Sequence, residues 1–291
     1  MEVAAQYVCN NVMKSNVSLV IDKFAKELKD ISGKCMDVGC GPGDVTKNIL
    51  LAALNPKATM IGTDIMTNMI GYANKMYGDE ERLKFEVLDI QRKNLPEKYI
   101  SKFDHIFSFH TLHWCHNIRQ AYENIYRMLQ PGKSMLISTV THCPGLFEAV
   151  EIMAQDARFS PYMENKQKYV GSLHYSTRPH EELKEILEDI GFQVHYISHQ
   201  DMYCRNTEKF LSMVTSQYTY EFLDKMPHNI REEFKNELRY KFTKKNIKNY
   251  KESQDNFKLY NEKDEADIPA LYSVLIVYAQ KKFHSGIDIS S

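Results

Sequence analysis

A short apolar run that leads straight into a glycine-rich turn constrains this chain more than any other feature. Residues 35–38 have the pattern of a buried strand, and Gly39, Gly41 and Gly43 follow it with the spacing G-x-G-x-G. A helix is predicted to begin at Asp44, whose side chain suits an N-cap. Glycines at such a junction let the backbone approach a ligand, and the start of the helix offers unpaired N–H groups. The turn therefore predicts a ligand site at the end of this strand.

Strand and helix patterns alternate along the chain. Further strands are predicted at 59–63, 83–88, 103–109, 133–140, 192–203 and 270–277, and helices at 17–29, 44–54, 67–77, 118–129, 180–190, 207–222 and 228–246. The inward face of the first helix is predicted to comprise Leu19, Val20, Phe24 and Leu28. Repeated strand–helix units with buried strands favour a parallel, doubly wound sheet. The expected fold class is α/β: a Rossmann-like, mostly parallel seven-stranded sheet with helices on both faces and a helical lid.

Composition and charge exclude several classes of protein. The formal net charge of −1 gives no overall attraction to nucleic acid, and the chain has no run of 18 apolar residues, so we expect neither a nucleic-acid partner nor a membrane span. The 6 cysteines form no CxxC pair, and no secretory signal is visible. We therefore expect free thiols and a cytoplasmic location. The sequence leaves the oligomeric state open.

Acidic residues follow the glycine turn at the ends of the next two predicted strands. Asp64 lies 21 residues after Gly43, where a carboxylate can accept hydrogen bonds from both hydroxyls of a ribose. Asp89 ends the third strand, where an adenine edge would lie. Each residue alone would also suit an ordinary turn. With Asp37, however, they fall at the C-terminal edge of consecutive strands, where open α/β sheets bind ligands. Together they predict a nucleoside site.

Four segments resemble the motifs of class I S-adenosylmethionine-dependent methyltransferases: Met36–Gly43, Gly62–Ile65, Val87–Ile90 and Leu129–Gly132. The resemblance implies that S-adenosylmethionine is the cofactor. It implies that the glycine turn and Asp37 hold the methionine end, that Asp64 holds the ribose, and that Asp89 and the backbone after it flank the adenine. The cofactor-binding residues expected on this basis are Asp37, Gly39, Cys40, Gly41, Gly43, Asp64, Ile65, Asp89, Ile90 and Ser108.

A narrower resemblance covers most of the chain. The segment FDHIFSFHTLHW at 103–114 is similar to one found in insect juvenile hormone acid methyltransferases. Shorter likenesses are Tyr7 with Asn11, LHYS at 173–176 and YAQK at 278–281. This resemblance implies methylation of a small apolar carboxylic acid, a sesquiterpenoid such as farnesoic acid or juvenile hormone acid, to its methyl ester.

The chain is expected to divide into four parts. Residues 1–30 are expected to form an N-terminal helical substrate cap, and residues 31–141 the cofactor-binding Rossmann-like core. Residues 142–283 are expected to hold lid helices plus the remaining sheet strands, and residues 284–291 a flexible tail. Aromatic residues in the second half either wall an apolar tunnel or pack as core.

Ester formation places few demands on the protein. A carboxylate is already ionised at neutral pH and needs no general base, whereas a hydroxyl acceptor would need one. Trp114, the single tryptophan, could donate its indole N–H to the acceptor or serve as a large core residue. His110 or His113 is expected to line the acceptor pocket and to form hydrogen bonds there. The three-residue spacing of His110, His113 and His116 is compatible with a metal site, but the reaction needs no metal and none is expected.

The N-terminal segment departs from the family pattern, in which a glutamine helps to hold the substrate carboxylate. Lys14 and Asn16 stand at or beside the expected polar positions. Lys14 would either pair with the acceptor carboxylate or remain a solvated surface lysine. The departure leaves two alternatives open: a methyltransferase for another small acid or hydroxyl metabolite, or a weakly active paralogue that binds cofactor or isoprenoid without useful turnover.

Overall fold

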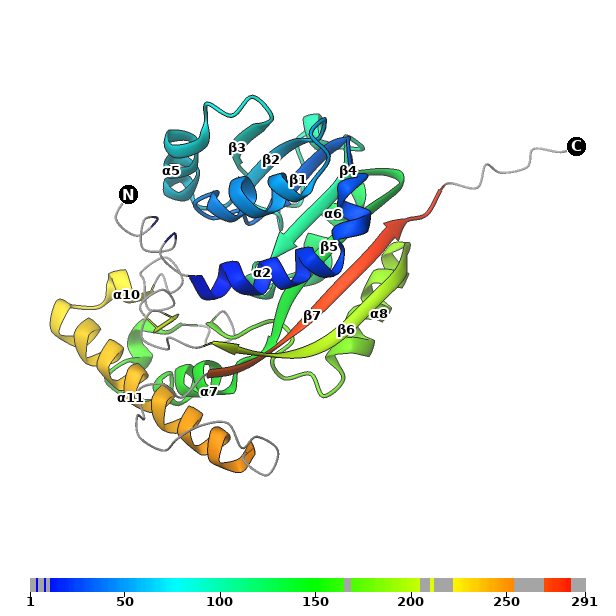
Figure 1. The fold of residues 1–291 in the computed structure, drawn as a ribbon. Helices are drawn as coiled ribbons and strands as arrows, with labels where there is room; N and C mark the ends of the chain where they lie inside the picture. Colours follow the sequence, from blue (N-terminus) through cyan, green and yellow to red (C-terminus); the bar gives the residue numbers. More distant parts are fainter. Residues whose placement is uncertain are drawn as a thin grey trace, which may run out of the picture.

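The protein is built around one seven-stranded sheet, shown in Figure 1 as a computed structural model. The structure describes residues 4, 8, 11–164, 169–204, 210–211, 222–253 and 270–283. The strands are β1 (Lys34–Val38), β2 (Thr59–Asp64), β3 (Leu83–Val87), β4 (Phe103–Phe109), β5 (Leu129–His142), β6 (Phe192–Cys204) and β7 (Ala270–Lys281). Their order in the sheet is β3-β2-β1-β4-β5-β7-β6. The seven strands and the predicted fold class are confirmed.

The direction of strand progression reverses between β1 and β4. The strands β3, β2, β1, β4 and β5 pair in parallel, whereas β7 runs antiparallel to both β5 and β6. From β1 the chain first builds outward to β2 and β3 and then returns to place β4 on the other side of β1. A reversal of this kind opens a crevice beyond the carboxyl ends of the central strands, which is where such sheets bind ligands.

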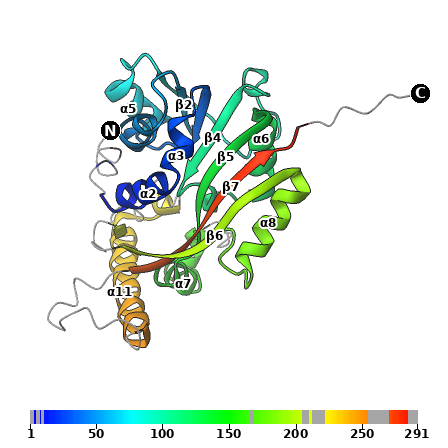
Figure 2. The ribbon, with the colours of Figure 1, turned by 45° about the vertical axis from the view of Figure 1, so that its right-hand side comes forward.

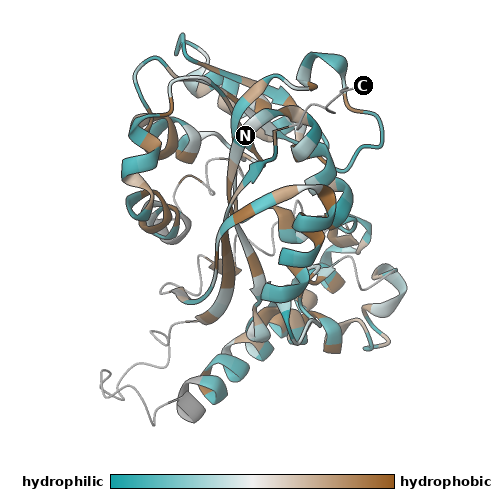
Figure 3. Cartoon of the chain, turned by 90° about the vertical axis from the view of Figure 1, so that its right-hand side faces the viewer, coloured by the Kyte–Doolittle hydropathy of each residue, from teal (hydrophilic) through white to brown (hydrophobic). Residues whose placement is uncertain are grey.

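Helices cover both faces of the sheet. One face packs against α2 (Asn11–Lys23), α3 (Ala25–Lys29), the helical segment that contains η1 (Thr46–Leu50) and α4 (Leu51–Ala53), and α5 (Thr67–Tyr77). The other face packs against α6 (Ile118–Met128) and α8 (Pro179–Ile190). Figure 2 shows α2 and α3 on one side of the strands and α6 and α8 on the other. Hydrophobic residues concentrate on the central strands, while the helices mix both kinds (Figure 3).

A further group of helices lies in the segments after β5 and after β6. It comprises α7 (Pro144–Met153), η4 (Ser160–Tyr162), α10 (Phe222–Lys225) and α11 (His228–Ser253). The helix predicted at 228–246 is therefore present and extends further. Most of the helix predicted at 207–222, the tail at 284–291 and Tyr7 lie outside the described residues. No helix among the described residues is both long and apolar enough to cross a membrane.

Three local predictions near the N-terminus are corrected by the structure. The helix predicted at 17–29 is broken at Phe24, and Leu19, assigned to its inward face, is 60% exposed. The buried stripe instead runs through Val17, Val20 and Phe24 at helical spacing, which leaves Leu19 a helical step of about 100° to the side. Asp44 does not cap the next helix: it lies within the first helical turn, and its carboxylate faces another part of the chain.

Candidate active site

The glycine turn adopts backbone conformations that side chains would oppose. The φ angles of Gly39, Gly41 and Gly43 are 77°, 54° and 82°. A Cβ at Gly39 would lie 2.1 Å from the side chain of Thr111, and one at Gly43 would lie 2.6 Å from the Phe85 ring. A Cβ at Gly41 would have no neighbour within 4 Å. The outer two glycines therefore allow close packing within the protein, and Gly41 is the point at which the backbone faces open space that a ligand can enter.

Hydrogen bonds fasten this turn to the neighbouring strands. The N–H groups of Gly39 and Cys40 both donate to the Thr63 carbonyl, at 2.7 and 2.9 Å. The Thr111 hydroxyl donates to the Gly39 carbonyl at 3.1 Å. The turn is thus held between the ends of β2 and β4. Cys40 itself is buried, and burial raises the pKa of its thiol, so its side chain is an interior group.

Two carboxylates lie beside the turn. Asp37 is 3% exposed and accepts a hydrogen bond from the Thr46 hydroxyl at 2.6 Å. Burial raises the pKa of Asp37 to about 7, and nearby Asp64 adds to the rise. Asp64 accepts hydrogen bonds from the N–H groups of Gly41 at 3.0 Å and Met66 at 2.9 Å, and burial raises its pKa as well. Two desolvated carboxylates favour a cationic ligand, because a positive charge stabilises their ionised forms.

The ends of β2 and β3 supply an apolar flank. Asp89 follows β3 and accepts a hydrogen bond from the Gln91 N–H at 2.8 Å. Ile90 is buried, whereas Ile65 is 60% exposed beyond the end of β2. Ser108 is fully buried and donates to the Val38 carbonyl at 2.8 Å, so its hydroxyl already has an acceptor behind the turn. Among these side chains, Ile65 offers the open apolar surface against which a flat ring could pack.

Polar and aromatic side chains gather just after β4. His110 has a φ of 54°, a strained value for a non-glycine residue, and is 8% exposed. Burial lowers the pKa of His110 to about 4, and its Nδ1 has no hydrogen-bond partner within the described part of the chain. The pKa of His113 is likewise lowered, to about 3, by burial and by His110. Its Nδ1 also has no hydrogen-bond partner among the described residues. Trp114 is half-buried, and its ring stands edge-on to Phe147 with centroids 6.3 Å apart.

Lys14 is not the solvated surface lysine that one interpretation of the sequence expected. Its Nζ lies 2.9 Å from an Asp44 carboxylate oxygen and 2.6 Å from the Val8 carbonyl. The side chain is 28% exposed, so it is not fully solvated, and its charge already has a partner. A role for Lys14 at the acceptor stays a prediction. Sequence reasoning named Asn16 but missed Tyr272, to which it is hydrogen-bonded; both side chains are buried.

No metal site emerges among these histidines. Among the described residues, no group of three or more His, Cys, Asp or Glu side chains is arranged to hold a metal ion.

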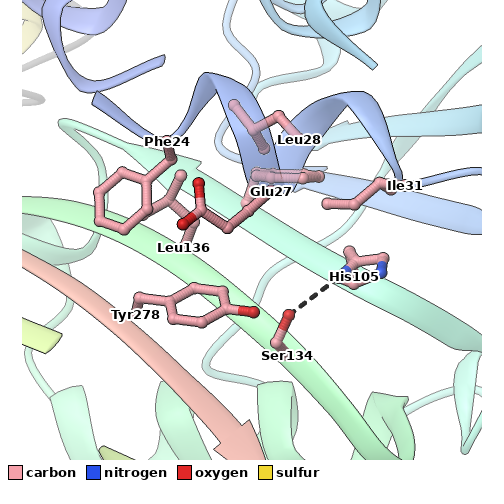
Figure 4. A pocket seen from close by; sticks show the side chains of 9 residues that line it. Phe24, Glu27, Leu28, Ile31, His105, Ser134, Leu136 and Tyr278 are labelled. Carbon is pink, nitrogen blue, oxygen red and sulfur yellow. Dashed lines mark hydrogen bonds between the residues drawn. The ribbon is translucent and has the colours of Figure 1, made fainter. Parts of the chain in front are cut away.

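A separate small pocket lies at the opposite end of β4, between α3 and the sheet (Figure 4). His105 Nδ1 and the Ser134 hydroxyl form a hydrogen bond of 2.8 Å in its wall. Burial lowers the pKa of His105 to about 4, which makes the ring a weak base. None of the side chains predicted to bind cofactor or substrate lines this pocket. We therefore assign the predicted chemistry to the glycine-turn end of the sheet.

Comparison with known proteins agrees with this geometry. A family model described as a methyltransferase domain matches residues 29–191. The juvenile hormone acid O-methyltransferase of Drosophila melanogaster is 33% identical over 230 residues, which cover 77% of this chain and 77% of that protein. The Bombyx mori protein of the same name is 30% identical over 187 residues, covering 63% of this chain and 66% of its own length.

Solved structures share the fold. The YcgJ protein of Bacillus subtilis has a TM-score of 0.57 at 14% identity, covering 91% of this chain and 98% of that one. Phosphoethanolamine N-methyltransferase 2 of Haemonchus contortus, solved with S-adenosylhomocysteine, has a TM-score of 0.51 at 20% identity, covering 92% of this chain and 52% of that one.

The sheet order, the glycine turn and the family match together define an S-adenosylmethionine-dependent methyltransferase. The open face of Gly41 and the two desolvated carboxylates fit that cofactor, whose methionine end carries positive charge. Within this class, the chain belongs to the carboxyl O-methyltransferase family that includes the insect juvenile hormone acid O-methyltransferases.

Proposed function

We propose that the enzyme methylates the carboxylate of a small apolar sesquiterpenoid acid, such as farnesoic acid or juvenile hormone acid. One observation carries the proposal: His110 and His113, which follow β4 beside the glycine turn, are only 8% and 5% exposed, and this burial lowers the pKa of both rings. Such groups are poor bases for removing a proton from a hydroxyl acceptor. A carboxylate acceptor arrives ionised and needs no base. The names of the two insect relatives point to the same class of acceptor.

The proposed reaction is a single displacement. S-adenosylmethionine supplies a methyl group on a sulfonium: a carboxylate oxygen forms the new C–O bond while the C–S bond breaks and its electrons return to sulfur. No proton moves. The protein therefore contributes alignment and exclusion of water. We assign Asp37 and the glycine turn to the methionine end, Asp64 to the ribose, and Asp89, Ile90 and the exposed face of Ile65 to the adenine.

Trp114 is proposed to orient the acceptor. Trp114 lies three residues after Thr111, whose hydroxyl donates a hydrogen bond to the Gly39 carbonyl. Its position is therefore coupled to the turn proposed to hold the methyl donor. Its ring and that of Phe147 provide apolar surface beside the acceptor. The indole N–H can donate a hydrogen bond but cannot accept one. Alignment of this kind, in a site from which water is excluded, can supply a large part of the rate of a displacement.

The division of the chain into cap, core, lid and tail is part of the proposal. In the described part of the cap, α2 packs on the sheet face next to η1, and α7 and α11 of the lid pack against each other. A cap and lid that close over an apolar acid would explain why these segments share one hydrophobic cluster with the core. The cytoplasmic location stays a prediction.

The decisive experiment supplies purified protein with methyl-labelled S-adenosylmethionine and one of three acceptors. Farnesoic acid tests the proposal, dodecanoic acid tests recognition of the isoprenoid chain, and farnesol tests a hydroxyl acceptor. We expect a base-labile labelled ester from farnesoic acid and little product from the other two. Base-resistant product from farnesol would replace the proposal with ether formation. Tight cofactor binding with no product from any acceptor would favour the weakly active paralogue.

A further inference from the structure

A pair of buried polar side chains joins the N-terminal helix to the last strand. Asn16 of α2 and Tyr272 of β7 are 6% and 5% exposed, and the Asn16 amide donates a hydrogen bond to the Tyr272 hydroxyl. Their surroundings are apolar, because Tyr272 belongs to the same hydrophobic cluster as Val17 and Val20. A polar pair inside an apolar wall is costly to bury unless its hydrogen-bonding groups are used.

This pair lies next to the groups assigned to methyl transfer. The ring of Tyr272 stands edge-on to that of His110, with centroids 6.1 Å apart and an angle of 62° between planes. His110 is followed by Thr111, whose hydroxyl binds the Gly39 carbonyl. A continuous set of contacts therefore leads from Asn16 through Tyr272 and His110 to the glycine turn.

Unused hydrogen-bonding capacity is concentrated here. The Asn16 amide donates to Tyr272, so the phenolic proton of Tyr272 remains available as a donor. Burial raises the pKa of Tyr272, which keeps that proton in place. His110 Nδ1 and the Ser138 hydroxyl are buried and have no partner among the described residues, and the two residues are adjacent because the His110 N–H donates to the Ser138 carbonyl at 2.9 Å. A ligand carrying polar atoms would satisfy these groups.

The positively charged side chain on the same helix, in contrast, already has partners. The Lys14 ammonium lies against Asp44 and the Val8 carbonyl, on the same helix that carries Asn16. An ammonium bound to the acceptor carboxylate would stabilise its ground state and make it a poorer nucleophile. Neutral hydrogen-bond donors can orient the same carboxylate but reduce its nucleophilicity less than an ammonium group would.

We infer that Tyr272, held in place by Asn16, donates a hydrogen bond to the acceptor carboxylate, so that neutral donors take the role that the sequence suggested for Lys14. The inference rests on the proposed function, since it concerns the same acceptor. It makes Tyr272 a substrate-contacting residue and Asn16 a positioning residue. It also explains why the acceptor is an acid: a cationic amine would meet donors instead of acceptors at this wall.

The test replaces Tyr272 with Phe, which removes only the hydroxyl. A hydrogen bond to a charged group is worth roughly tenfold to a hundredfold in affinity, so we expect the KM for farnesoic acid to rise by about that factor while kcat changes by less than about twofold. The Kd for S-adenosylhomocysteine should stay the same. Tyr278→Phe is the matched control, because it makes the same change on the same strand at the distant pocket of Figure 4.

A binding measurement separates this inference from the proposed function. Calorimetry on the complex with S-adenosylhomocysteine should show that farnesoate binds about tenfold or more tightly than its neutral methyl ester, and that Tyr272→Phe removes the preference. That result without ester formation by the wild-type enzyme would refute the function and keep the inference. Ester formation with an unchanged KM in Tyr272→Phe, or equal binding of acid and ester by the wild type, would overturn the inference.

A second variant covers the case in which Tyr272→Phe does not fold. Asn16→Ala leaves the phenol in place but removes its support, so the KM for farnesoic acid should rise several-fold, and less than in Tyr272→Phe. A lower Tm with an unaltered KM would mean that the pair only fastens α2 to the sheet, and would contradict the inference.

Discussion

Strand β4 has a histidine near each end, and the two histidines differ in whether their ring nitrogen has a hydrogen-bond partner. Burial lowers the pKa of both His105 and His110 to about 4. His105, at the amino end, has a hydrogen-bond partner in Ser134, whereas Nδ1 of His110, just beyond the carboxyl end, has none among the described residues. A buried polar atom without a partner costs about 1–3 kcal/mol. The protein satisfies its polar groups at one end of the strand and leaves them available at the other, where the ligands are proposed to bind.

The largest effect is expected from Asp64→Ala at the carboxyl end of β2, on the same edge of the sheet as His110. The variant loses the carboxylate that holds the Gly41 and Met66 N–H groups and that we assign to the ribose. Loss of two charge-assisted hydrogen bonds should weaken S-adenosylmethionine binding roughly a hundredfold or more. Calorimetry measures the change. Unaltered affinity in a folded variant would contradict the assignment of the ligands to the carboxyl edge of the sheet.

Trp114→Phe should have the next largest effect. The substitution keeps an aromatic ring against Phe147 but removes the indole N–H, so turnover of farnesoic acid should fall about tenfold to a hundredfold. The affinity for S-adenosylhomocysteine should change little. Steady-state kinetics measure the turnover of farnesoic acid, and a binding titration measures the affinity for S-adenosylhomocysteine. A normal kcat/KM would reduce Trp114 to a packing residue.

The third effect concerns pH. Because the pKa of Asp37 is raised to about 7, the free protein carries this group protonated below neutrality. A cationic ligand favours the ionised form, so affinity for S-adenosylmethionine should increase roughly tenfold from pH 6 to pH 8. The free energy of unfolding of the free protein should change in the opposite direction: it should decrease as the pH rises from about 4 to about 7. The reason is that Asp37 loses its proton at a lower pH in the unfolded chain than in the folded protein. Asp37→Asn should flatten both profiles; profiles that persist in this variant would assign the titration elsewhere.

The smallest effect belongs to the amino end of β4. Ser134→Ala removes the partner of His105 and should cost about 1 kcal/mol, lowering Tm by a few degrees. Methyl transfer should be unaffected, because the pocket of Figure 4 contains none of the assigned groups. Thermal unfolding and an activity assay together make the comparison. A large loss of kcat/KM at normal stability would show that both ends serve the reaction.

Local patterns in the sequence were sufficient for the elements of the core. The helix predicted at 67–77 has the same bounds as α5, and Gly191 ends α8 in the left-handed conformation, with a φ of 114°. The positions of the glycine turn and of Asp64 could be predicted because a strand, a turn and a helix follow each other directly in the chain. Such features depend on neighbours in sequence.

Contacts between distant segments could not be predicted in this way. Asn16 and Tyr272 meet only because the fold brings α2 to the first residues of β7, and Lys14 meets Asp44 only because the same helix lies beside η1. Nothing near these residues in the sequence specifies either partner. The error at Leu19 has a similar cause, because the break at Phe24 and the choice of buried face depend on what the helix packs against.

The place of β7 in the sheet has a consequence for how the protein is made. Since β7 lies between β5 and β6, residues 129–142 find their second partner only at 270–281, and β6 has no other neighbour in the sheet. Until that strand arrives, β5 presents an open apolar edge that another chain can pair with. Aggregation during synthesis should therefore depend on how quickly this one late segment inserts, and variants that slow its insertion should lower the yield of soluble protein without touching the active site.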